Sequence, residues 1–182
     1  MQIALHAVTN QTGVIVSRTF LFAAWLAASV VHPCAAQAGT TCTGRIFDEA
    51  AAPYGLDPTL LKAITWVESH GNPDAVGPRL KDGHRAWGAA QINDIHLAEL
   101  APYGVTRRDL LDPCVNLRLS AWVLANCMQQ TGPTWAAVGC YNTGPGSRNY
   151  AAQLKYVRLV KAAYDGYRGQ AVQARAANVA AQ

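Results

Sequence analysis

The chain has 182 residues, which is enough for one domain with a hydrophobic core but not comfortably for two. Hydrophobic residues make up 51% and charged residues 14%, a composition that excludes an intrinsically disordered chain. The formal net charge of +4 comes without a dense Lys/Arg run, so the sequence lacks the basic patch typical of nucleic-acid-binding proteins. A weak positive balance suits an anionic polymer, although ordinary solubility charge is the more common explanation.

The N-terminus has the pattern of a secretory signal peptide, which we predict over residues 1–38. Arg18 precedes an uncharged run over residues 19–31, and this run is shorter than the roughly 20 apolar residues that span a bilayer. Small residues follow at positions 34–38, as a signal peptidase requires. We therefore expect an exported protein, and the alternative is that this segment is retained as a membrane anchor.

Helical patterns dominate the rest of the chain. We predict helices over residues 43–54, 57–70, 91–100, 112–131, 135–141 and 149–164. Two of them begin with Asp-Pro, an N-cap followed by proline at the first helical position. No convincing alternating strand occurs in the sequence, so we predict an all-α, single compact helical domain over residues 39–168, with a possible small hairpin in residues 74–90. Residues 169–182 are mostly Ala, Gln and small polar residues, and we predict a frayed or disordered tail there.

Four cysteines remain once the predicted signal peptide is removed. An even count in an exported chain favours two disulfides, and four cysteines allow three pairings. We favour the pairs Cys42–Cys114 and Cys127–Cys140, because the second would join two consecutive helices across a short turn. No C-x-x-C pair occurs, so we predict no metal site.

Glu68 is the residue that points to chemistry. It follows Leu60, Leu61 and Ile64 at helical spacing, so it lies on the apolar stripe of its helix and in the last turn. Burial and the exposed carbonyls at a helix end both disfavour a carboxylate, so both should raise its pKa. A carboxylic acid that stays protonated can donate to a glycosidic oxygen. The alternative is a structural glutamate that is hydrogen-bonded at the helix end.

Two further motifs carry polar and aromatic side chains. Residues 88–93 (GAAQIN) place Gln91 and Asn93 after a polar loop, and their amides suit sugar hydroxyls and acetamido groups, although turns use the same residues. Residues 141–146 (YNTGPG) place an aromatic and an amide side chain at a helix end, just before a flexible turn. A simple turn of the Asn-Gly type is the alternative for this second motif.

Taken in order, Glu68-Ser69 with Asn72-Pro73, residues 88–93 and Tyr141-Asn142 resemble the catalytic domain of the soluble lytic transglycosylases. The resemblance covers residues 43–165. It implies a lysozyme-like fold of the goose type, with a groove for alternating N-acetylglucosamine and N-acetylmuramic acid. It assigns the catalytic role to Glu68. The expected substrate-binding residues are Gln91, Asn93, Tyr141, Asn142 and, in the last helix, Tyr156.

The resemblance implies a reaction that needs a single acid, whereas a standard glycosidase uses two carboxylates. Asp82 and Asp94 are the nearest other acids, and we expect them to be solvated loop charges or helix caps. Glu68 would cleave the muramyl bond and form a 1,6-anhydro end, with no cofactor and no metal. A lysozyme-type hydrolase is one alternative, and a catalytically inactive wall-binding adaptor is another.

The small size, export signal and cysteines look most similar to family members attached to secretion, conjugation and pilus systems. This implies a periplasmic, monomeric protein whose partners are peptidoglycan strands and components of such an apparatus, with no nucleic acid. The family usually has Leu-Met where this chain has Ala89-Ala90, a loss of bulk that could widen a sugar subsite. Trp66, Trp87 and Trp135 could stack on sugars, although core packing is the more common role of tryptophan.

Overall fold

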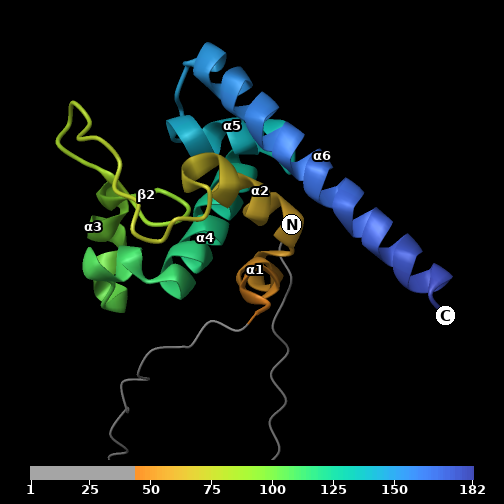
Figure 1. Cartoon of the computed structure of the whole chain (residues 1–182). Coiled ribbons are helices and arrows are strands. Elements are labelled where there is room, and N and C mark those ends of the chain that lie inside the picture. Colours follow the sequence, from red (N-terminus) through yellow and green to blue (C-terminus); the bar gives the residue numbers. More distant parts are fainter. Residues whose placement is uncertain (1–43) are drawn as a thin grey trace, which may run out of the picture. The chain divides into compact units, whose positions relative to one another are not determined.

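The computed structural model describes residues 44–182, and this part of the chain is mainly α-helical (Figure 1). Its α-helices are α1 (Ile46–Ala51), α2 (Pro58–Ser69), α3 (Leu97–Leu100), α4 (Pro113–Thr131), α5 (Trp135–Thr143) and α6 (Tyr150–Ala180). Short 3-10 helices are η1 (Ala52–Tyr54), η2 (Asp94–His96), η3 (Ala101–Tyr103) and η4 (Arg108–Leu111). The two strands, β1 (Ala86–Trp87) and β2 (Ile92–Asn93), are antiparallel. The prediction of a mainly helical fold is confirmed.

The two predicted Asp-Pro helix starts form as the sequence indicates. The Asp57 side chain caps α2 by accepting a hydrogen bond from the Thr59 backbone N–H at 2.8 Å, and Asp112 caps α4 in the same way. α2 ends where His70 adopts a left-handed conformation with φ of 57°. Glu68 therefore lies in the last turn of α2, where the sequence predicts it.

The core forms where α4 packs against α1, α2 and α5, and where α6 covers α2 and α5 (Figure 1). Each of the main helices contributes fully buried apolar side chains, among them Leu61, Ile64, Leu124, Val138 and Val160. Each such side chain stabilises the fold by roughly 1.5–3 kcal/mol. This core fixes the relative positions of α2, α5 and α6, which carry the candidate site.

A tyrosine on α6 also contacts the start of α2. The Tyr164 hydroxyl donates a hydrogen bond to Oδ2 of Asp57 at 2.6 Å, while the other carboxylate oxygen of Asp57 caps the helix. Arg168 in turn donates to the Tyr164 hydroxyl at 3.1 Å. The N-cap of α2 is therefore bound to α6 by a side chain that follows it by 107 positions.

The strand pair surrounds a tight turn that requires a glycine. Trp87 pairs with Ile92, and Val76 forms an isolated bridge to Trp87. The hairpin expected in residues 74–90 is thus shifted, because its second strand begins at Ile92. Gly88 has φ of 74°, and a Cβ there would clash with the carbonyl oxygen of Leu110, so neither the conformation nor the space admits a side chain.

The C-terminal segment differs from the prediction. α6 does not end near residue 164 but continues to Ala180, so residues 169–180, expected to be part of a disordered tail, are helical. All residues from 168 to 182 are exposed, so intrinsic propensity rather than packing explains the helix, and Ala, Gln and Arg all have high helix propensity. Although α6 has 31 residues, no helix in the described part of the chain is long and apolar enough to cross a membrane.

One predicted disulfide is confirmed. Cys127 near the end of α4 is bonded to Cys140 on α5, with a sequence separation of 13. Cys114 is also disulfide-bonded, and Cys42, the partner predicted for it, lies outside the described residues. The predicted signal peptide, residues 1–38, lies outside them as well.

Candidate active site

Glu68 forms a short hydrogen bond with a tyrosine from the opposite helix. Its Oε1 atom accepts a bond from the hydroxyl of Tyr156, on α6, at 2.6 Å. Glu68 is half-buried, whereas Tyr156 is only 4% exposed. Burial raises the pKa of Glu68 from its ordinary 4.5 to about 7, although the bond from Tyr156 acts to lower it. A carboxyl with this pKa exists in both protonation states near neutral pH.

A second tyrosine stacks on the first. The rings of Tyr141, on α5, and Tyr156 are nearly parallel, with an interplanar angle of 9° and centroids 6.5 Å apart. Burial and then the nearby charge of Glu68 raise the pKa of both phenols above their ordinary value of 10. Both tyrosines therefore remain protonated hydrogen-bond donors while Glu68 titrates.

Side chains from three helices hold the turn over residues 88–91 in place. The Tyr141 hydroxyl donates to the carbonyl of Ala90 at 2.8 Å, and Ser69 in α2 donates to the carbonyl of Ala89 at 2.6 Å. Asn116 in α4 is fully buried and accepts a bond from the Ala90 backbone N–H at 2.7 Å. Asn116 was not predicted, because its partners lie at least six residues away and are brought to it only by folding.

Gln91 and Asn93 were both expected to contact substrate, but each uses one of its side-chain amide atoms for a hydrogen bond within the protein. Gln91 has a left-handed backbone with φ of 50°, and its amide nitrogen donates to the carbonyls of Gly88 and Ala75 at 2.9 and 3.2 Å. The Asn93 side-chain oxygen caps η2 by accepting from the Ile95 backbone N–H at 2.9 Å. Within the described part of the chain, the Gln91 side-chain oxygen and the Asn93 side-chain nitrogen have no hydrogen-bond partner. Those two atoms are what the amides can offer a ligand.

The structure brings three of the six predicted site residues into direct contact, namely Glu68, Tyr141 and Tyr156. Asn142 follows Tyr141 in the last turn of α5 and is exposed. Gln91 and Asn93 belong to the turn that Tyr141 binds through Ala90.

Ala89 and Ala90, which were expected to widen a sugar subsite, are not on the protein surface. Ala89 is 4% exposed and Ala90 is fully buried. The missing bulk of these two side chains therefore lies inside the protein and not on an open wall.

Asp94 was expected to be a solvated loop charge or a helix cap, and it is neither. It is a buried structural carboxylate with 7% exposure, and the cap of η2 is Asn93. Its hydrogen-bond donors are the backbone N–H of Arg85, the ring Nδ1 of His84 and the indole Nε1 of Trp87, and Arg107 pairs with it at 3.4 Å. Burial alone would raise the pKa of Asp94, but these partners together lower it. Asp94 thus stays ionised and holds the loop before β1. Among the described residues, no other carboxylate contributes to the pKa of Glu68.

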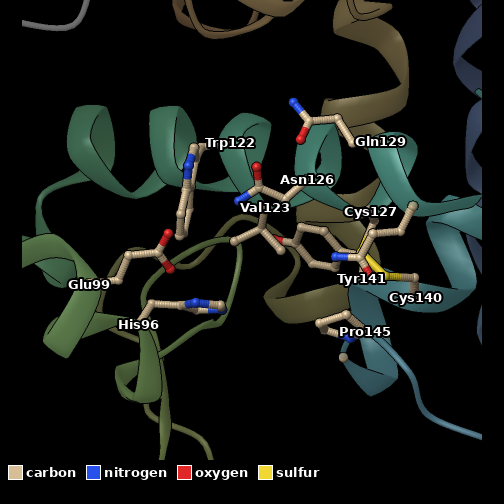
Figure 2. Close-up of a pocket in the computed structure, with 12 residues that line it drawn as sticks. His96, Glu99, Trp122, Val123, Asn126, Cys127, Gln129, Cys140, Tyr141 and Pro145 are labelled. Carbon is tan, nitrogen blue, oxygen red and sulfur yellow. A yellow bond between two sulfur atoms is a disulfide. The ribbon is translucent and has the colours of Figure 1, made fainter.

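A pocket of about 370 Å³ adjoins Tyr141 (Figure 2). Its walls combine aromatic, amide and titratable groups, including His96, Glu99, Trp122, Asn126, Tyr141 and Pro145. His96 and Trp122 make an edge contact with ring centroids 5.2 Å apart, and burial lowers the pKa of His96, so its ring is neutral at neutral pH. Glu68 does not line this pocket, but Tyr141 connects the two through its stacking on Tyr156. The volume falls within the range of small-molecule sites.

The mainly helical fold, with the half-buried carboxyl of Glu68 in the last turn of α2, agrees with the expected lysozyme-like domain. Residues 45–164 match the Transglycosylase SLT domain, and the chain belongs to this family. The family match confirms the resemblance seen in the sequence motifs. It covers every residue assigned above to the candidate site.

Several proteins are similar to the chain over about two thirds of its length. It is 38% identical over 123 residues to the X polypeptide of Escherichia coli, covering 66% of this chain and 72% of that protein. It is 32% identical over 125 residues to the Peptidoglycan-binding-like protein of Escherichia coli O157:H7, covering 65% and 75%. It is 30% identical over 126 residues to the Invasion protein IagB of Salmonella typhimurium (strain SL1344), covering 69% and 78%.

Proposed function

We propose that this chain is a lytic transglycosylase that cleaves the β-1,4 bond between N-acetylmuramic acid and N-acetylglucosamine in peptidoglycan. The observation that carries the proposal is the half-buried Glu68, whose pKa is about 7 beside two protonated tyrosines. A pKa near the working pH lets one carboxyl donate a proton in one step and accept one in the next. Membership of the SLT family supports the same reading.

In the first step Glu68 acts as an acid. Because Oε1 accepts the bond from Tyr156, the proton of the acid form resides on Oε2. That proton passes to the glycosidic oxygen as the bond from this oxygen to C1 of the muramyl residue breaks. The N-acetyl group of the substrate stabilises the positive charge at C1, and the hydrogen bond from Tyr156 stabilises the newly formed carboxylate.

In the second step Glu68 acts as a base. The carboxylate removes the proton from the C6 hydroxyl of the same muramyl residue while O6 bonds to C1. The product is a 1,6-anhydro end and no water is consumed. The proton that Glu68 donated leaves on the hydroxyl of the departing glucosamine, and the proton from the C6 hydroxyl restores the acid form of Glu68. One carboxyl is sufficient, which agrees with the structural role found for Asp94.

The pocket beside Tyr141 fits the glycan groove that this reaction needs. Tyr141 lines the pocket from α5, and Asn142 follows it as an exposed residue of the same helix. The amide atoms of Gln91 and Asn93 without a partner suit the polar groups of an N-acetylated sugar. The relative named Peptidoglycan-binding-like protein supports a wall glycan as the ligand. We propose these four residues, with Tyr156, as the substrate-contacting set.

We further propose that the protein acts in the periplasm, as a monomer, to open the wall locally for a secretion, conjugation or pilus apparatus. The signal-peptide pattern and the Cys127–Cys140 disulfide support export, because disulfides persist in oxidising compartments. The similarity to the Invasion protein IagB supports a link to a secretion system.

The test is digestion of purified sacculi followed by mass analysis of the released muropeptides. We expect the unaltered chain to release 1,6-anhydro products and Glu68→Gln to be slower by about 10²–10⁴-fold. Circular dichroism would establish that the variant folds. Reducing ends without anhydro products would identify a hydrolase instead. Equal activity of the unaltered chain and the Glu68→Gln variant would show that Glu68 is not the catalytic residue. No activity in either would favour a wall-binding adaptor.

A further inference from the structure

A second pocket, of about 410 Å³, lies between α2 and α6. Trp66 lines it from α2, and Ala163, Gly166, Tyr167 and Gln170 line it from α6. Trp66 precedes Glu68 by two positions, which corresponds to roughly 200° around an α-helix. Trp66 therefore leaves α2 on the side opposite to Glu68, and neither Glu68 nor Tyr156 lines this second pocket.

The chemistry of the second pocket is that of an aromatic platform with polar neighbours. Trp66 is 47% exposed, and His70 holds its ring by an edge contact with centroids 4.6 Å apart. Gln170 supplies an amide, and the ammonium of Lys62 stands 4.3 Å from the ring centroid of Tyr167. Among the described residues that line the pocket, none is acidic.

Gly166 leaves this pocket open, although the backbone conformation at this position does not require a glycine. It lies inside α6, and a Cβ built there would meet nothing within 4 Å, so neither crowding nor conformation requires a glycine. Glycine within a helix costs about 1 kcal/mol relative to alanine. What the missing side chain does provide is free space beside Trp66.

The size and composition of the second pocket favour a small polar ligand over a protein. Its volume falls within the range of about 300–1,000 Å³ found for small-molecule sites, whereas a stable protein interface buries about 800 Å² on each partner. Trp66 is the one large apolar side chain of the lining that is exposed. An indole face beside the amide of Gln170 suits the C–H face and the polar substituents of a pyranose ring.

We infer that this second pocket is an accessory saccharide site, in which an N-acetylated sugar of the wall glycan lies against Trp66. The choice of wall glycan as the ligand rests on the proposed function. Such a site would hold the enzyme on the wall while its catalytic groove is empty.

The test compares two glycines of α6 in the full chain carrying Glu68→Gln. Gly166→Leu fills the pocket, and Gly169→Leu is the matched control, because Gly169 also has no neighbour within 4 Å of a Cβ but does not line the pocket. Both changes should raise the thermal stability of the helix. We expect only Gly166→Leu to reduce co-sedimentation with purified sacculi, by about tenfold, which equals about 1.4 kcal/mol.

A titration with an N-acetylglucosamine tetrasaccharide gives the direct readout. The indole N–H resonance of Trp66, assigned by its loss in Trp66→Phe, should shift on titration in the Gly169→Leu chain and not in the Gly166→Leu chain. Equal sedimentation of the two chains, loss in both, or no shift of Trp66 would each overturn the inference. Because all chains carry Glu68→Gln, the result does not depend on whether Glu68 is the catalytic acid.

Discussion

Ionisation of the half-buried Glu68 should destabilise the folded protein. The pKa of Glu68 is about 7 in the folded chain against an ordinary 4.5, so the folded state binds this proton more tightly than the unfolded state does. The stabilisation is fully present below pH 4.5 and is lost as the pH rises through about 7. The difference between the two pKa values corresponds to about 3 kcal/mol of unfolding free energy.

Glu68→Gln isolates this contribution. The glutamine keeps the side-chain shape and an oxygen that can accept the bond from Tyr156, but it does not ionise. We expect the variant to match the unaltered chain near pH 4 and to be more stable by about 3 kcal/mol near pH 8. In a chain of this length that equals a rise in Tm of about 6–12 °C. Thermal unfolding followed by circular dichroism at the two pH values measures it.

Asp74→Asn provides the control, because Asp74 is an exposed carboxylate. Its substitution should change Tm by the same small amount at both pH values. If the Tm difference between Glu68→Gln and the unaltered chain were the same at both pH values, Glu68 would not be a buried acid and the reasoning would fail.

Two further substitutions test the surroundings of the acid. Tyr156→Phe removes the bond that lowers the pKa of Glu68, so we expect lower wall-cleaving activity and an alkaline limb of the pH profile shifted upward by about one pH unit. The same substitution at Tyr103, which is 80% exposed, should shift nothing. Asp94→Asn weakens a buried, charge-assisted network and should cost about 3 kcal/mol in urea unfolding at pH 7. Because the pKa of Asp94 is lowered in the fold, this difference should shrink as the pH falls below about 4; a constant difference would mean that Asp94 is not ionised.

The parts of the site that depend on local signals could be predicted from the sequence. Asp57-Pro58 and Asp112-Pro113 specify helix starts through contacts within three residues, and both caps form. The position of Glu68 on the apolar stripe follows from helical periodicity alone. The family resemblance pointed to Tyr156 as a substrate-binding residue, and its bond to Glu68 appears only in the structure. A helix end and an apolar stripe are both determined by residues that are close in the sequence, so they can be predicted without the rest of the chain.

The features that were missed arise from distant contacts or from competing weak preferences. Asp94 appeared to be a loop charge, because its burial depends on Trp87 and Arg107, which approach it only when β1 and the segment before η4 fold together. His96 and Trp122 meet in the pocket from two separate elements, and neither carries a motif. In residues 169–180, low sequence complexity suggested disorder, but the summed helix propensity of the same residues predominates.

Two tyrosines of α6 donate 2.6 Å hydrogen bonds to carboxyl groups at the two ends of α2, yet the pKa of one carboxyl is lowered and that of the other is raised. Burial acts to raise the pKa of Asp57 as well, but bonds from Tyr164 and Thr59 outweigh it and lower that pKa, so Asp57 is ionised at neutral pH. At Glu68 the same phenol contact is too weak to overcome desolvation. A tyrosine bond of the same length therefore accompanies an ionised helix cap at one end of α2 and, at the other end, a carboxyl that titrates near neutral pH.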